Sequence, residues 1–174
     1  MIGVMHPVAG AATGADELRT AYQDHYRSLV RLAALLIDDV SMCEDVVQDA
    51  FVKTFVSRSR VREPEKLPAY LRSAVLNGAR SRLRRREVAR RHLAVVPPPQ
   101  ASAESGALLH HDQMAVVAAL RTLPDRQREV LVLRYWMGLG EAEIADTLQI
   151  ATGTVKTHVR RGLEALARKL EAHR

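Results

Sequence analysis

The chain has 174 residues, enough for one domain or two small ones, and 47% of them are apolar, enough to bury a core. Its net charge of +6 and its pI near 10 favour a polyanionic partner such as nucleic acid. The single cysteine excludes an intrachain disulfide, no Cys/His cluster has zinc spacing, and neither a signal pattern nor a membrane-length apolar run is present, so we expect a cytoplasmic protein without metal or cofactor.

Residues 16–93 are predicted to form an N-terminal helical domain, preceded by a flexible tail over residues 1–15. The tail is rich in Gly and Ala and has no periodicity. Beyond it, apolar residues recur every three or four positions, which predicts an amphipathic helix with the inner stripe Leu18, Tyr22, Tyr26, Leu29, Ala33 and Leu36. Asp38-Asp39 then offers capping residues, and Ser41-x-x-Glu44 matches a capping box at the start of a second helix.

The second predicted helix has two faces of different character. By spacing, its inward side holds Val46, Val47, Ala50, Phe51, Thr54 and Phe55. Its other side holds Asp45, Gln48, Asp49 and Val52. A polar loop over residues 57–66 is expected to follow.

Leu67-Pro68 opens a long third helix, because proline suits the first helical turn. Asn77-Gly78 is normally a turn signal, but the inner stripe of Leu71, Val75, Ala79 and Leu83 continues through it in phase. We therefore expect the helix to run through Gly78, although glycine inside a helix costs about 1 kcal/mol relative to alanine.

The end of this third helix is the most basic stretch of the chain. Glu87 is the one acidic residue within this stretch that could pair with its arginines. The arginines are Arg80, Arg82, Arg84, Arg85, Arg86, Arg90 and Arg91. We predict that these guanidinium groups contact nucleic-acid phosphates, which would relieve their mutual repulsion and release counterions. The alternative is a solvated helix end before a disordered linker.

Residues 94–106 separate this block from the rest, because three consecutive prolines, 97–99, exclude helix and favour an extended linker. Residues 107–174 then predict a second small domain of four helices. In it, Pro124 opens the second helix, Gly138 ends it, and Gly140 is the N-cap of the third. The sequence thus predicts an all-α protein of two domains joined by a Pro-rich flexible linker.

Residues 139–161 of the second domain are typical of a DNA-binding helix-turn-helix. Acidic residues gather on the first helix of the pair and basic residues on the second. Ile144, Ala145 and Leu148 supply one apolar stripe, and Val155 and Val159 the answering one. A helix that enters the major groove presents cations and small hydrogen-bonding groups near its N-terminal half, as Thr154, Lys156 and Thr157 do here. The alternative is an ordinary helical hairpin with a solvated basic face.

Five motifs, in this order and around a Pro-rich linker, resemble those of the extracytoplasmic-function (ECF) sigma factors of bacterial RNA polymerase. They are residues 26–33 (YRSLVRLA), 45–51 (DVVQDAF), 70–77 (YLRSAVLN) with the arginine run, 123–130 (LPDRQREV) and 153–157 (GTVKT). The resemblance covers the whole chain outside the tail. It implies a region 2-like domain over residues 16–93 and a region 4-like domain over 107–174.

The resemblance also implies roles for individual residues. Core polymerase would bind Asp45, Gln48 and Asp49, and the loop 57–66 would cap a flipped-out base of the downstream promoter box. The opened strand would be held by Asn77, Arg80 and Arg84. The upstream box would be read by Thr154, Lys156, Thr157, His158, Arg160 and Arg161. The implied function is to bind core polymerase, recognise promoter DNA and help separate its strands, without enzymatic activity of its own. An anti-sigma factor is usual in the family.

The chain departs from the family pattern at four positions. Gln149 replaces a glycine at the helix-turn-helix turn, where a left-handed backbone carries strain. Ala151 replaces a serine cap, which leaves Thr152 as the alternative cap. Tyr70 replaces a common tryptophan, and Gly78 weakens the third helix.

Two other classes of protein share parts of this pattern. A two-component output regulator would explain residues 124–170, but no phosphate-accepting βα pattern precedes them. A resolvase-like recombinase needs a nucleophilic Ser or Tyr in a mixed α/β domain, and residues 16–93 show no strand-like alternation. Co-purification with core polymerase would separate the three classes.

Overall fold

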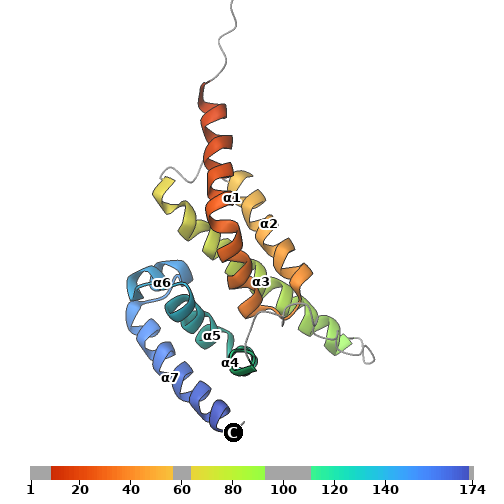
Figure 1. Cartoon of the computed structure of the whole chain (residues 1–174), viewed down its shortest axis with the longest axis vertical. Coiled ribbons are helices and arrows are strands. Elements are labelled where there is room, and N and C mark those ends of the chain that lie inside the picture. Colours follow the sequence, from red (N-terminus) through yellow and green to blue (C-terminus); the bar gives the residue numbers. More distant parts are fainter. Residues whose placement is uncertain (1–8, 57–63, 93–110, 173–174) are drawn as a thin grey trace, which may run out of the picture.

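The computed structural model describes residues 9–56, 64–92 and 111–172 (Figure 1). Within these ranges every regular element is helical, which confirms the all-α prediction. The predicted linker and most of the predicted loop 57–66 lie outside the described residues. In chain order the elements are α1 (Ala9–Leu36), α2 (Val40–Val56), η2 (Pro64–Lys66), α3 (Leu67–His92), α4 (His111–Arg121), α5 (Asp125–Leu131), η4 (Val132–Trp136), α6 (Glu141–Leu148) and α7 (Thr152–Glu171).

The N-terminal domain consists of α1, α2 and α3, which pack against one another. Each helix contributes an apolar stripe at the spacing of three and four that the sequence shows. Fully buried members include Leu29 and Leu32 on α1, Val46 on α2, and Leu71 and Val75 on α3. Packing of the three stripes encloses one core.

Two of the expectations for this domain are wrong at the helix ends. Residues 9–15 belong to α1 and are not a tail, since the alanines at 9, 11 and 12 favour helix. The cap of α2 is Asp39, one of the two capping residues that the sequence offers, whereas the predicted box of Ser41 and Glu44 is wrong. The Asp39 carboxylate accepts hydrogen bonds from the backbone N–H of Met42 (3.1 Å) and from the Ser41 hydroxyl (2.7 Å).

The predicted inner stripe of α2 is confirmed with one exception. Val46, Val47, Ala50, Phe51 and Thr54 are buried as predicted, but Phe55 is 47% exposed. Phe55 lies in the last turn of α2, one residue before the helix ends at Val56, and it is left at the surface. On α1, Tyr22 is also half exposed and stacks on Tyr26 with ring centroids 4.6 Å apart.

Helix α3 runs through Gly78 as predicted. A Cβ at Gly78 would lie 3.0 Å from Cγ1 of Val46 on α2, which is too close for an ordinary contact. Glycine is therefore used here for the close approach of α2 and α3, not for a turn.

The C-terminal domain contains α4, α5, α6 and α7, with η4 continuing α5 as a π-helical turn. Gly138 has φ of +69° and ends that turn, as predicted. Gly140 caps α6, and its N–H donates to Oε2 of Glu143 at 2.8 Å. Gln149 has φ of 55° and ψ of 50°, the predicted left-handed conformation, between α6 and α7.

The two domains pack against each other, with α6 against α3 and both α4 and η4 against α1 (Figure 1). Their apolar cores form one continuous cluster, in which Leu32 and Val75 belong to the first domain and Val130, Leu133 and Ile144 to the second. This arrangement brings the basic helix α3 next to the C-terminal domain.

Candidate nucleic-acid interface

The second helix of the helix-turn-helix, α7, presents one buried side and one exposed side. Val155 is fully buried and Val159 is partly buried against the core, which confirms the predicted stripe. Gly162 is buried too, and a Cβ there would lie 3.0 Å from Cδ1 of Leu131. This packing turns the opposite side of α7 outward, with Thr154, Lys156, Arg160 and Arg161 exposed.

The start of α7 differs from the family pattern as the sequence indicates, but Thr152 does not replace the missing cap. Ala151 is the N-cap and makes no side-chain hydrogen bond. Its backbone carbonyl instead accepts from the N–H groups of Thr154 (2.9 Å) and Val155 (3.1 Å). The helix start is thus held by its backbone and by the burial of Val155.

The six candidate reading residues on α7 are not equally available. Lys156 Nζ lies 3.6 Å from Glu141 Oε2, and Arg160 Nη1 lies 3.1 Å from Glu164 Oε1. Arg161 is exposed and has no ion pair in the described part of the chain. The Thr157 hydroxyl donates to the carbonyl of Gly153 at 3.0 Å. His158 is half-buried, and its Nδ1 is enclosed without a hydrogen-bond partner.

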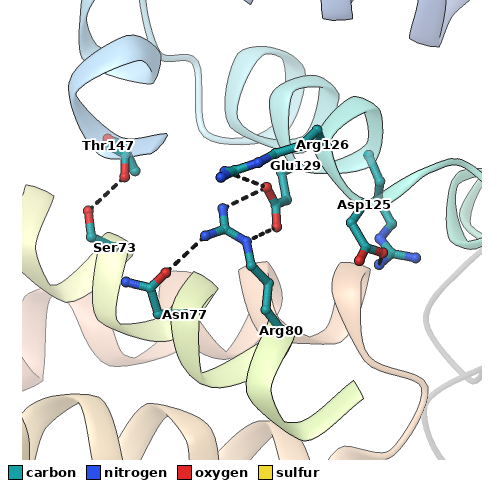
Figure 2. Close-up of polar contacts among 8 residues, drawn as sticks. Ser73, Asn77, Arg80, Asp125, Arg126, Glu129 and Thr147 are labelled. Carbon is teal, nitrogen blue, oxygen red and sulfur yellow. Dashed lines mark hydrogen bonds and ion pairs between the residues drawn. The ribbon is translucent and has the colours of Figure 1, made fainter. Parts of the chain in front are cut away.

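Two of the candidate residues on α3 form a cluster with the C-terminal domain. Arg80 donates through Nε and Nη2 to the two carboxylate oxygens of Glu129 on α5, with an Nη2–Oε2 distance of 2.7 Å (Figure 2). Its Nη1 donates to Oδ1 of Asn77 at 2.9 Å. Asn77 and Arg80 are thus hydrogen-bonded to each other, and the Arg80 guanidinium is paired with a carboxylate of this same chain.

The prediction that the arginine run meets only Glu87 is wrong. Arg82 lies 3.6 Å from Asp45 and 3.4 Å from Asp49 on α2, and Arg86 pairs with Asp38. These carboxylates are distant in sequence, so only folding brings them to the helix. Arg84 and Arg85 remain exposed, and no ion pair of theirs occurs among the residues described.

The outer face of α2 is exposed as the periodicity predicts. The side chains of Asp45 and Asp49 are 60% and 57% exposed, and Gln48 lies between them at the surface. Exposed apolar residues in the C-terminal part of the same helix are Val52, Phe55 and Val56. Carboxylates next to exposed apolar groups suit a protein partner with a basic, partly apolar surface.

Several ionisable groups at a helix start or in buried positions have shifted pKa values. Hydrogen bonds from Ser41 and Met42 hold the pKa of Asp39 below its ordinary value. Burial raises the pKa of the Cys43 thiol to about 11. Burial also lowers the pKa of the half-buried Arg72 guanidinium.

Sequence reasoning missed the contacts that join the two domains. Among them, Glu129 on α5 contacts Arg80 of α3, and Arg121 at the end of α4 contacts the end of α1. The sequence offered only a weak signal for Glu129, a carboxylate directly before the apolar run of residues 130–133. Among the described residues, no three His, Cys, Asp or Glu side chains are grouped as a metal site would require.

None of the helices in the described ranges combines the length and the apolar character that crossing a membrane requires.

Comparison with known proteins assigns both domains. The family model for Sigma-70 region 2 matches residues 21–88, and that for Sigma-70 region 4 matches residues 113–166. An RNA polymerase sigma-E factor of Streptomyces avermitilis is 30% identical over 145 residues, which are 83% of this chain and 80% of that protein. The ECF RNA polymerase sigma factor SigL of Mycobacterium tuberculosis is 29% identical over 173 residues, 96% of this chain and 97% of that protein.

Solved structures show the same fold. The sigma factor RpoE from Bartonella quintana, in complex with the anti-sigma factor NepR, has a TM-score of 0.72 at 23% identity, over 90% of this chain and 98% of that one. CnrH, in complex with the cytosolic domain of CnrY, has a TM-score of 0.69 at 25% identity, over 93% of this chain and 95% of that one.

A helical region 2 followed by a helical region 4 defines the class of RNA polymerase sigma factors, which are non-catalytic subunits that take part in promoter recognition. Within that class, the chain belongs to the ECF sigma factors, which confirms the family that the motifs predicted.

Proposed function

We propose that this ECF sigma factor uses three separate surfaces: α2 for core polymerase, α7 for the upstream promoter box, and α3 for the opened DNA strand. The observation that carries the proposal is the exposed cationic side of α7, in a chain that also exposes an acidic and apolar face on α2. The polymerase supplies the chemistry, and this chain supplies position and sequence preference.

Core polymerase binds the outer face of α2. Asp45, Gln48 and Asp49 project from a helix whose opposite side fills the core, so they are free for a partner without loss of fold. Arg82 balances part of the carboxylate charge from α3. A basic partner surface would replace this exposed and therefore weak pairing.

The upstream box is read by the exposed side of α7. Arg161 lies seven positions after Thr154 and four after Thr157, so the three share a helix face. Arg is the usual bidentate reader of guanine, which makes Arg161 the base-reading cation. Arg160 and Lys156 lie on either side of this face and bind DNA phosphates. His158 contacts the DNA from the half-buried edge of the face.

The strand-opening role belongs to α3. Asn77, Arg80 and Arg84 lie on successive turns of this helix, where they would hold the separated strand by polar and phosphate contacts. Extruding an unpaired base costs a few kcal/mol, which these contacts must offset. Arg84 and Arg85 are exposed members of the run that form no ion pair among the described residues, so phosphate binding begins with them.

An anti-sigma factor is a further partner. The solved neighbour RpoE is a sigma factor in complex with the anti-sigma factor NepR, and it covers 90% of this chain. We infer that this chain too can be bound by an anti-sigma factor.

The proposal is tested by run-off transcription with core polymerase on a genomic promoter library, followed by binding measurements with variants. Replacing Asp45 and Gln48 with Ala should weaken core binding by roughly 1–3 kcal/mol for each lost contact, while helicity stays unchanged. Asp24→Ala, which removes an exposed carboxylate of α1, is the matched control. Wild-type affinity of the double variant for core polymerase would refute the α2 assignment.

A second measurement tests α3. Neutralising Arg84 and Arg85 together should lower the salt slope of promoter binding by about two units and leave base preference in the upstream box unchanged. An unchanged slope would mean that the run is a solvated helix end.

A further inference from the structure

The two domains are joined by a carboxylate that lies buried at their interface. Glu129 on α5 is only 2% exposed, and Arg80 of α3 reaches it from the other domain with two donors (Figure 2). Within its own domain, Arg126 lies beside the same carboxylate, with Nη1 3.4 Å from Oε2. Arg80 is therefore the bidentate partner of this buried charge.

A buried carboxylate is costly unless it is paired and hydrogen-bonded. With the domains together, Arg80 meets that need with a fork-to-fork geometry, and Asn77 orients the guanidinium through Nη1. With the domains apart, water and the half-exposed Arg126 can take over, because Glu129 would then lie at the surface. The pair thus favours the docked arrangement without making separation prohibitive.

Other contacts between the two domains also favour the docked arrangement. Arg121 of α4 donates through Nη2 to the carbonyl oxygens of Ala34 (2.8 Å) and Ile37 (3.1 Å), at the C-terminal end of α1. A cation there also complements the helix dipole. The Ser73 hydroxyl of α3 donates to the Thr147 carbonyl of α6 at 3.0 Å (Figure 2).

We propose that Glu129 is an interdomain latch: a carboxylate that takes the place of a nucleic-acid group on Arg80 and keeps the two domains docked while the chain is free of DNA. This inference rests on the proposed strand-holding role of α3. It adds that the role is regulated by the C-terminal domain of the same chain.

The latch acts selectively on the three proposed surfaces. The outer face of α2 and the cationic side of α7 stay exposed in the docked arrangement, whereas Asn77 and Arg80 are occupied. Core polymerase and duplex DNA can therefore be engaged first. The strand-holding surface becomes complete only when the domains separate, which prevents the free chain from binding single-stranded nucleic acid indiscriminately.

The first experiment measures domain separation directly in the full chain. Dyes are attached at Lys53→Cys on α2 and Ala167→Cys on α7, two exposed positions away from the interface, in a Cys43→Ala background. Energy transfer between the dyes gives the open fraction. Glu129→Gln should raise the ratio of open to docked molecules by about tenfold or more, because it removes the charge but keeps the shape.

Two further variants make the result specific. Asp125→Asn changes the same charge on the same helix, but Asp125 pairs with Arg128 of its own domain at 2.7 Å, so it should leave the open fraction unchanged. Arg121→Ala removes interdomain contacts at a different point and should open the chain while keeping Glu129 intact. Circular dichroism confirms that each variant keeps its helices.

The second experiment measures binding of a fluorescent oligothymidine strand by anisotropy. If only the open form presents Arg80, the apparent dissociation constant equals the intrinsic one divided by the open fraction. Opening by Arg121→Ala should therefore tighten binding by the same factor as it raises the open fraction. Adding Arg84→Ala to that variant should weaken binding again.

The outcomes separate the latch from the function on which it rests. An unchanged open fraction in folded Glu129→Gln overturns the latch, whatever the DNA result. An opened chain that binds oligothymidine no better, and is indifferent to Arg84→Ala, overturns the strand-holding role of α3 and supports the latch as a docking contact alone. Equal opening by Asp125→Asn overturns the specific role of Glu129, since any lost charge on α5 would then suffice.

Discussion

Substitution of Gly78 by alanine should destabilise the protein, although alanine is the better helix former. Helix propensity alone predicts a gain of about 1 kcal/mol in the free energy of unfolding at this interior position of α3. The new Cβ, however, would lie 3.0 Å from Cγ1 of Val46, whose side chain is 1% exposed. Overpacking of this kind costs about 1–3 kcal/mol.

Val46 cannot easily turn away from the new methyl group. A β-branched side chain in a helix has one strongly preferred rotamer, and Val46 is enclosed by the core of α1, α2 and α3. The cost should therefore outweigh the propensity gain, which leaves a net loss of about 1 kcal/mol in the free energy of unfolding.

A double-mutant cycle isolates this contact. Val46→Ala alone should cost about 2 kcal/mol, for two buried methyl groups and the cavity they leave. In that background the methyl group added by Gly78→Ala no longer meets the valine side chain, so Gly78→Ala should become stabilising by about 1 kcal/mol. The predicted coupling between the two sites is thus about 2 kcal/mol, and it shows as a reversal of sign.

The assay is urea denaturation followed by far-ultraviolet circular dichroism. Gly153→Ala is the control, because a Cβ at this position of α7 meets nothing within 4 Å and should never be destabilising. If Gly78→Ala stabilises the wild-type background, the contact with Val46 is not tight and the close approach of α2 and α3 does not explain the glycine.

Three further predictions concern α2 and α7. Asp39→Ala should lower the free energy of unfolding by about 1 kcal/mol at neutral pH. Because the pKa of Asp39 is held low in the folded state, this stabilisation is present above the ordinary carboxyl pKa and should vanish as pH falls through the folded pKa. A difference in urea melts that does not depend on pH would contradict this. Cys43, with a pKa raised to about 11, should react with a thiol reagent at least ~100-fold more slowly in the native than in the unfolded chain, and equal rates would show that it is accessible. Arg161→Ala should weaken the binding free energy for promoter DNA by about 1–3 kcal/mol and relax base preference at one position of the upstream box. Arg160→Ala should instead weaken binding to all sequences by a similar amount. The measurement is binding of each variant to a panel of single-base substitutions in the upstream box. If Arg160→Ala changed base preference and Arg161→Ala acted uniformly, α7 would be rotated by about one residue from this placement.

Local patterns in the sequence predicted the helices and most of their faces. Apolar spacing predicted the buried stripe of α2 and the continuation of α3 through Gly78, because each depends on residues within two turns. The left-handed Gln149 followed from the family resemblance, because Gln149 stands where the family has glycine at the helix-turn-helix turn. Where spacing failed, as at Phe55, the reason is that periodicity does not say where the neighbouring helices end.

Long-range pairing could not be predicted in the same way. The arginine run appeared to face a single glutamate because Asp38, Asp45 and Asp49 come from another part of the chain. Glu129 is 49 residues from Arg80, beyond the predicted linker. Such contacts depend on how the domains pack, which neither charge counts nor periodicity contains.

The charged pairs of the proposed DNA-binding surfaces fall into two energetic kinds. Those of α7, Lys156 with Glu141 and Arg160 with Glu164, join exposed side chains and are worth about 0–1 kcal/mol, so DNA can displace the carboxylates at little cost. The pair of Arg80 with Glu129 joins a half-buried cation to a buried anion, and it can be broken only if the interface opens to water. The same chemistry, a cation matched to a carboxylate of its own chain, therefore leaves the upstream-reading surface available at all times and ties the strand-holding surface to the separation of the domains.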